Sequence, residues 1–236
     1  MGDPVIAMKN YFGEKQDVFG RESLILVEGN DDAFFISALL RYLGIEANHV
    51  GITPFRGTPQ LEITIRTIAK HPSVTAGLIK NIGIIVDADK SCESASKAIN
   101  DSLAKIGWNI PDLGKVVDSG KGCRIGSFVI PNCSNQGDLE SLLLGTASQC
   151  TLLPVADGFI QAARQKANSE GLSLRGSVSK RIAQVYIAGK SIELKRGAGL
   201  AAHDGGIFDL NSPDLDLLKD FLRSLIKREQ EPEPAS

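Results

Sequence analysis

The chain has 236 residues, of which 42% are hydrophobic, and its formal net charge at pH 7 is −2. This length suffices for one α/β domain with a sizeable buried core, and the hydrophobic fraction excludes an intrinsically disordered protein. The near-neutral charge excludes a molecule that attracts nucleic acid over its whole surface, so a phosphate-bearing partner needs a local basic strip or a bridging metal.

Two compositional features bear on the compartment in which the protein works. The sequence contains no run of about 18 apolar residues and no secretory signal pattern at its start, so neither a membrane span nor a membrane partner is expected. The four cysteines form no CxxC pair and have no histidine at ligand spacing, which argues against a zinc site. Free thiols favour a reducing compartment, and we therefore expect a cytoplasmic protein.

Strand and helix patterns alternate through the first 145 residues. Apolar runs predict strands at residues 23–28, 49–55, 82–89 and 124–131. Apolar residues at helical spacing predict helices between these strands, at residues 30–44, 58–70 and 91–106. Because the strand runs are too apolar for a half-exposed sheet, we predict a parallel sheet that helices cover on both faces.

Helical patterns dominate the remainder of the chain. They lie at residues 137–145, 154–170, 177–189 and 213–228. We predict an α/β, Rossmann-like core over residues 1–145 and a helical C-terminal extension over residues 146–229 that packs on the same domain. The last residues, 230–236, are polar and rich in proline, which is typical of a flexible tail.

Acidic residues follow two of the predicted strands. Glu28 ends the first strand, and Asp87 and Asp89 end the third. On an extended chain residues two apart point the same way, so Asp87 and Asp89 repel each other unless a metal or a basic side chain lies between them. The functional crevice of an open parallel sheet lies at the carboxyl ends of its strands. Since Mg²⁺ takes hard oxygen ligands, these acids predict a magnesium site there.

The motifs that carry these acids resemble a known family. LILVEGNDD, residues 24–32, resembles the Glu-Gly motif of the Toprim domain, the catalytic module of topoisomerases, DnaG-type primases and OLD (overcoming-lysogenization-defect) nucleases. IGIIVDADKS, residues 82–91, is similar to that family's strand ending in Asp-x-Asp, and the resemblance covers roughly residues 21–145. It implies a Toprim fold in which Asp87 and Asp89 hold Mg²⁺ or Mn²⁺, while Glu28 binds metal or transfers a proton.

Within this family the sequence is more similar to OLD-like nucleases and to a small stand-alone Toprim group of unknown function. Asp32 matches an additional acid four residues after the motif's glutamate, although as Asp rather than Glu. The segment GDLESLLL resembles an acidic-Leu-Glu motif through Asp138 and Glu140, and Lys180 matches a lysine on a later helix. The resemblance implies that Asp32 and Glu140 can hold a second metal and that Lys180 stabilises charge on a transferring phosphoryl group.

The function that this resemblance implies is Mg²⁺-dependent cleavage of phosphodiester bonds in DNA or RNA, in a defence or nucleic-acid processing system, with Glu28 and Lys180 as catalytic residues. A partner ATPase and a dimer are both compatible with it. The alternative is a non-catalytic Toprim-shaped adaptor that binds nucleotide or a partner ATPase. The sequence contains no topoisomerase tyrosine motif, ATPase motif or primase zinc module.

Each candidate residue also has a structural interpretation. Asp87 and Asp89 are ordinary residues of turns and helix N-caps, and Asp32 can be a cap as well. Glu28 and Glu140 complement the dipole of the helix that follows each of them. Lysines on exposed helix faces, such as Lys180, are commonplace. The sequence leaves both interpretations open.

Overall fold

The computed structural model describes residues 5–6, 17–45, 47–172, 176–191, 197–203 and 206–226. Its sheet has six strands in the order β1-β3-β2-β4-β6-β5. The strands are β1 Val5–Ile6, β2 Ser23–Val27, β3 Val50–Pro54, β4 Asn81–Asp87, β5 Val116–Asp118 and β6 Arg124–Ile130. All neighbouring strands run parallel except β5, which is antiparallel to β6. The predicted α/β fold with a mostly parallel sheet is confirmed.

Helices surround this sheet and continue beyond it. They are α1 Asn30–Tyr42, α2 Thr58–Ala69, α3 Pro72–Thr75, α4 Cys92–Lys105, α5 Leu139–Thr146, α6 Leu152–Ser169, α7 Val178–Lys190, α8 Ala198–His203 and α9 Asp216–Ile226, with short 3-10 turns η1 Ala47–His49 and η2 Pro213–Leu215. None of the helices in the described ranges is long and apolar enough to cross a membrane.

The predicted elements are present, and the additional ones are short. The elements that the sequence pattern did not indicate are β1, α3, β5, α8 and η1. The predicted third strand ends two residues early, at Asp87, and the predicted last helix begins with the turn η2. The predicted tail at 230–236 lies outside the described residues, and the domain boundary at residue 145 stays a prediction.

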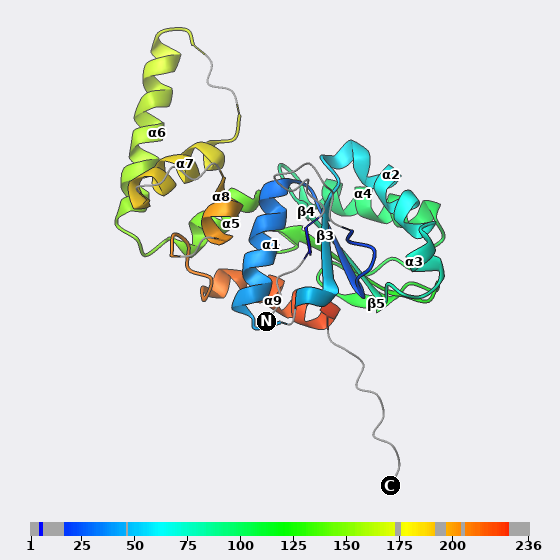
Figure 1. Cartoon of the computed structure of the whole chain (residues 1–236). Coiled ribbons are helices and arrows are strands. Elements are labelled where there is room, and N and C mark those ends of the chain that lie inside the picture. Colours follow the sequence, from blue (N-terminus) through cyan, green and yellow to red (C-terminus); the bar gives the residue numbers. More distant parts are fainter. Residues whose placement is uncertain are drawn as a thin grey trace.

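Alternation along the strands divides the core into two layers. Ile25 and Ile85 face one side of the sheet, in an apolar cluster with residues of α1, α5 and α9. Leu26 and Ile84 face the other side, in a cluster with residues of α2, α3 and α4. Figure 1 shows α1 and α9 on one side of the sheet and α2 and α4 on the other. The prediction of a sheet covered on both faces is therefore confirmed.

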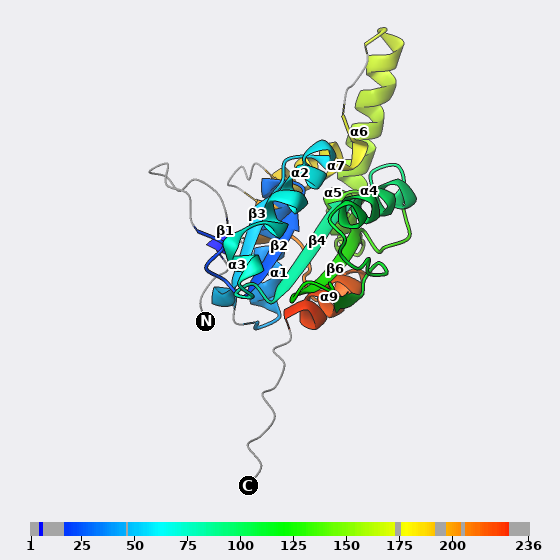
Figure 2. The same ribbon diagram turned by 90° about the vertical axis from the view of Figure 1, so that its right-hand side faces the viewer.

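The late helices belong to the first of these layers. Leu143 of α5, Tyr186 of α7 and Ala201 of α8 are buried in the same cluster as α1. Helix α6 packs against this group through Ala156, while its length extends away from the sheet (Figures 1 and 2). The chain after β6 thus contributes directly to the packing around α1, where the candidate site begins.

Two glycines allow the last helix to lie close against the sheet. Gly83 of β4 and Gly126 of β6 are directly paired. A Cβ atom at Gly83 would lie 2.5 Å from Leu225 Cδ2, and one at Gly126 would lie 2.8 Å from Phe221 Cε2 and 3.0 Å from the backbone oxygen of Lys115. Because real Cβ atoms do not approach other atoms this closely, α9 depends on the absence of side chains at these positions.

We expect Gly126→Ala to lower the free energy of unfolding by about 1–3 kcal/mol, since the added methyl group overpacks a core that includes a backbone carbonyl. Urea unfolding followed by circular dichroism measures this loss. Gly158→Ala on α6 is the matched control, because a Cβ there meets nothing within 4 Å. It should leave stability unchanged or raise it by up to about 1 kcal/mol through helix propensity. Equal losses in both variants would contradict this account of α9.

Candidate functional site

The carboxyl ends of β2 and β4 bring the first acids together. The two strands are parallel neighbours, with Val27 opposite Ile85. Glu28 therefore leaves the sheet beside Asp87, and the backbone N–H of Asp87 donates a hydrogen bond to the Glu28 carboxylate. The prediction that these acids meet at one edge of the sheet is confirmed. Burial raises the pKa of Glu28, and the charge of Asp89 raises it further.

Asp87 lies at the centre of the cluster. Its side chain continues the row of Ile85 on the face covered by α1 and α5. Burial, together with the negative charges of acidic neighbours, raises the pKa of Asp87 to about 9; the neighbours are Asp32, Glu28, Asp138 and Glu140. One carboxylate oxygen, Oδ1, is buried and accepts no hydrogen bond within the described part of the chain. Asp87 is consequently a buried acid among mostly negative neighbours, and Lys180 is a basic group that interacts with it.

Asp32 is both a capping residue and a member of this cluster. Its Oδ2 atom accepts a hydrogen bond of 2.9 Å from the N–H of Gly29, so the capping interpretation holds. Its side chain is also buried, and burial raises its pKa to about 7, with smaller contributions in the same direction from Asp31 and Glu28. A cap exposed to solvent would keep an ordinary pKa.

The backbone conformation of Asp89 differs from the extended one that was predicted. Its backbone is left-handed, with φ of 48°, so it does not continue the extended strand that would align it with Asp87. Instead, its N–H donates to the oxygen of Gly137 at 2.8 Å and its oxygen accepts from the N–H of Gly137 at 3.0 Å. This bridge ties the end of β4 to the loop before α5. The side chain is exposed, and its charge acts on Glu28.

Glu140 and Lys180 are the members of the cluster that come from helices α5 and α7. Lys180 Nζ lies 3.8 Å from Glu140 Oε2, and the two side chains are 55% and 13% exposed. Glu140 Oε2 is a buried oxygen without a hydrogen-bond donor in the described ranges. Burial raises the pKa of Glu140, and Lys180 partly opposes this. Partial burial disfavours the charged form of Lys180, but the acids Glu140, Asp87, Asp138 and Asp32 together raise its pKa.

Asp138 holds Glu140 and Lys180 in position, a role that the sequence alone did not indicate. It is 6% exposed, and its Oδ1 accepts from the N–H of Ser141 at 2.9 Å, which caps α5. Its Oδ2 accepts from the hydroxyls of Ser177 at 3.0 Å and Ser179 at 2.7 Å, at the start of α7. Burial alone would raise the pKa of Asp138, but these hydrogen bonds bring it below its usual value. Asp138 therefore fixes the start of α7, and with it Lys180, beside Glu140.

Unusual backbone conformations gather at the same edge of the sheet. The non-glycine residues with positive φ in the described ranges are Arg56, Asp89 and Cys133, which follow β3, β4 and β6. Such conformations cost of order 1–3 kcal/mol each and cluster at functional sites. The backbone N–H of Arg56 donates to the backbone oxygen of Glu28 at 2.9 Å, and the Arg56 side chain is exposed.

The residues present fit a divalent cation in their chemistry. Within the described ranges, no group of three or more His, Cys, Asp or Glu side chains is already arranged to hold a metal ion. However, Asp87 Oδ1 and Glu140 Oε2 are buried acceptors that no donor of the described residues reaches, and such atoms are costly unless something binds them. A small hard cation prefers carboxylate oxygen ligands of this kind.

These features define an α/β protein in which acids gather at the carboxyl ends of two parallel strands. The chain belongs to the family described as "Protein of unknown function (DUF3226)", whose model matches residues 22–227. No curated protein matches the sequence.

Solved structures similar to this chain come from OLD proteins. The C-terminal region of the Xanthomonas campestris pv. campestris OLD protein has 17% identity and a TM-score of 0.48, covering 89% of this chain and 95% of that one. The C-terminal region of the Burkholderia pseudomallei OLD protein has 16% identity and a TM-score of 0.46, covering 87% of this chain and 98% of that one. At these levels of similarity no residue role is transferred.

The burial of Asp87 predicts a pH-dependent stability in buffer with EDTA. Between the ordinary aspartate pKa and the folded value of about 9, the folded chain retains a proton that the unfolded chain has lost. The free energy of unfolding therefore falls as the pH rises through this window, because the unfolded chain binds fewer protons than the folded chain. Asp87→Asn should remove this dependence and raise the free energy of unfolding at pH 8 by on the order of 1 kcal/mol.

Urea unfolding of the wild type and the variant between pH 5 and 9 measures the difference. Asp89→Asn is the comparison, because this acid is exposed, and it should change stability little. A lower free energy of unfolding for Asp87→Asn than for the wild type across this pH range would mean instead that Asp87 is a hydrogen-bonded structural partner.

Proposed function

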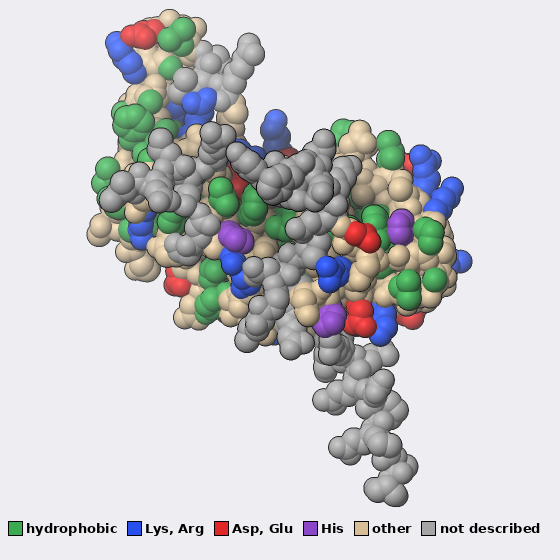
Figure 3. Space-filling view, viewed as in Figure 1, with side chains coloured by type: hydrophobic (Ala, Val, Ile, Leu, Met, Phe, Trp, Pro, Cys, Tyr) green, Lys and Arg blue, Asp and Glu red, His purple; other side chains and the backbone are tan. Residues whose placement is uncertain are grey.

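We propose that the protein cleaves phosphodiester bonds in DNA or RNA with the help of Mg²⁺ or Mn²⁺. The observation that best supports this function is the buried Asp87, which lies among other acids with an unsatisfied oxygen. A purely structural role gains nothing from this arrangement, because like charges in a buried site disfavour folding. Acidic and basic side chains are interspersed on the face shown in Figure 3, so attraction of a polyanion depends on a local site.

The acids divide into two groups that would hold cations. Glu28, Asp87 and Asp89 come from the ends of β2 and β4, and Asp32 and Glu140 from the starts of α1 and α5. A bound divalent cation would supply charge stabilisation at the phosphate oxygens. Asp32 and Glu140 would be the ligands of a second cation.

Two side chains suit roles in the chemistry itself. Glu28 has a raised pKa, which brings its carboxylate closer to the pH at which accepting and returning a proton is efficient. Lys180 remains protonated because the acids around it raise its pKa, so its ammonium group is available to stabilise negative charge on the phosphoryl group. Asp138 acts on this lysine as a positioning residue through Ser177 and Ser179.

The second candidate function is a non-catalytic adaptor that binds nucleotide or a partner ATPase. It is favoured by the arrangement of the acids, since no group of three within the described ranges is already spaced for a metal. The pairing of Lys180 with Glu140 also leaves the lysine engaged with the protein rather than free for a substrate.

Alanine substitutions distinguish metal binding from chemistry. We expect Asp87→Ala to abolish Mn²⁺ binding, measured by calorimetry, together with cleavage of supercoiled plasmid, single-stranded DNA or RNA. Lys180→Ala should retain Mn²⁺ binding but lose a factor of about 10²–10³ in cleavage rate, the usual cost of removing one charge-stabilising donor. Lys166→Ala on α6 is the matched control, because that lysine pairs with Glu170 on the exposed helix and should cleave like wild type.

The outcomes separate the candidate functions. If Lys180→Ala cleaves as fast as the control, Lys180 is a solvated surface residue and has no part in catalysis. If the wild type cleaves none of the substrates with either metal, the adaptor function takes precedence.

A further inference from the structure

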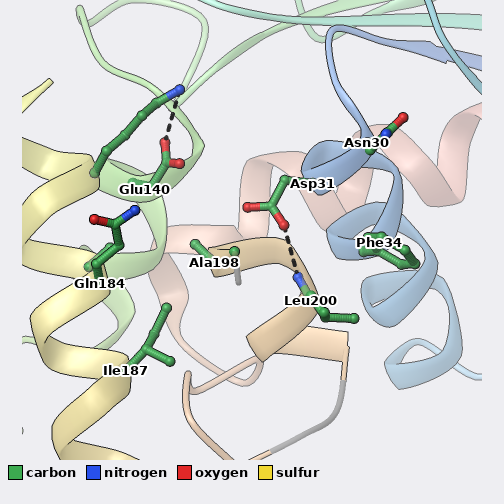
Figure 4. Close-up of a pocket in the computed structure, with 11 residues that line it drawn as sticks. Asn30, Asp31, Phe34, Glu140, Gln184, Ile187, Ala198 and Leu200 are labelled. Carbon is green, nitrogen blue, oxygen red and sulfur yellow. Dashed lines mark hydrogen bonds and ion pairs between the residues drawn. The ribbon is translucent and has the colours of Figure 1, made fainter. Parts of the chain in front are cut away.

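A pocket of about 300 Å³ adjoins the acidic cluster. It lies between α7 on one side and α1 on the other, with α8 beneath it (Figure 4). Glu140 and Lys180 form part of its lining, so the pocket opens directly beside the groups to which the chemistry is assigned. Its volume is at the lower end of the range for small-molecule sites.

The lining combines apolar walls with a few polar groups. Phe34 of α1, Ile187 of α7 and Leu200 of α8 supply apolar surface. Two side-chain amides, Asn30 and Gln184, also line the pocket, and both residues are exposed. Flat apolar walls with a few hydrogen-bonding groups suit an aromatic ligand that has polar edges, and Asn and Gln amides are groups that pair with the edges of nucleobases.

The pocket is built by tight packing between α1 and α8. The N–H of Leu200 donates to Asp31 Oδ1 at 3.1 Å (Figure 4). A Cβ atom at Gly199 would collide with the backbone carbonyl of Asp31, so α8 approaches α1 as closely as backbone atoms permit. The floor of the pocket is consequently fixed by backbone contacts.

We propose that this pocket receives one unpaired nucleobase of the substrate, next to the phosphate that is cleaved, so that the preferred substrate is single-stranded or locally unpaired nucleic acid. This inference rests on the proposed function. A base within a duplex is stacked on its neighbours and paired at its edge, so it enters a concave pocket only after leaving the stack. Unpaired bases, in contrast, stack on aromatic side chains and use their polar edges for hydrogen bonds.

The position of the pocket supports a base rather than an unrelated apolar molecule. Glu140 and Lys180 belong to both the pocket and the acidic edge, so a ligand in the pocket lies beside the residues assigned to the phosphate. A nucleotide joins a base to a phosphate over a short span, which matches this juxtaposition.

Fluorescence anisotropy of the full chain with Ca²⁺ in place of Mg²⁺ tests the proposal. The probes are a labelled 12-nucleotide single-stranded DNA, the same strand in a blunt duplex, and a deoxyribose-phosphate chain of equal length without bases. We expect the single strand to bind about tenfold more tightly than the base-free chain, the size of one stacked base, and more tightly than the duplex.

A variant that fills the pocket gives the decisive comparison. Gln184→Trp places a large ring at an exposed pocket residue and should weaken binding of the single strand about tenfold, without changing binding of the base-free chain or of Mn²⁺. Gln165→Trp, at an exposed position of α6 outside the pocket, is the matched control and should bind like wild type. Thermal melts verify that both variants fold.

Three results would overturn the proposal. They are equal binding of the single strand and the base-free chain, tighter binding of the duplex, or normal single-strand binding by Gln184→Trp. In each case the proposed function survives if the wild type binds Mn²⁺ and cleaves nucleic acid. Absence of both Mn²⁺ binding and cleavage in the wild type would remove the proposed function, and the base pocket with it.

Discussion

Crowding of carboxyl groups around Asp87 is the constraint on which the rest of the site depends. The sheet creates it, because the apolar residues of β2 and β4 must pair in the core, and this pairing places Glu28, directly after β2, beside Asp87 at the end of β4. Each buried apolar side chain contributes about 1.5–3 kcal/mol. Repulsion between two charges near a protein surface is about 4 kcal/mol at about 4 Å. The summed core therefore outweighs the repulsion, which is relieved by raising the pKa of Asp87 rather than by moving the strands.

The helices after β6 complete the site. Helix α9 lies against the paired glycines of β4 and β6, and α8 packs against α1 with the same closeness. Helix α7 carries Lys180, and Asp138 fixes the start of that helix through Ser177 and Ser179. The positive charge that partly balances the acids thus comes from a segment far along the chain. Shortening the chain after α5 would remove this charge, together with part of the apolar layer that covers α1.

Prediction from the sequence succeeded where the determining interactions are local or follow from strand parallelism. Apolar runs and helical spacing fixed the main elements, and parallel pairing implied that Glu28 and Asp87 meet. Short elements such as β5 and α8 escaped prediction because three or six residues display no periodicity. The left-handed backbone of Asp89 was missed since aspartate seldom adopts it. The role of Asp138 depends on hydroxyls about 40 positions away, and only the folded chain brings these together.

Glu140 and Lys180 belong both to the acidic edge of the sheet and to the neighbouring pocket. In the proposed function they therefore link binding of a base to cleavage of the phosphodiester bond beside it. Both residues lie where a bound base would end and its phosphate would begin. Lys180 Nζ lies 3.8 Å from Glu140 Oε2, a distance that is longer than a direct hydrogen bond. A phosphate placed there therefore competes for the lysine against a weak interaction. A base in the pocket and its phosphate beside Lys180 would belong to one ligand, so binding of the base would hold the phosphate near the lysine.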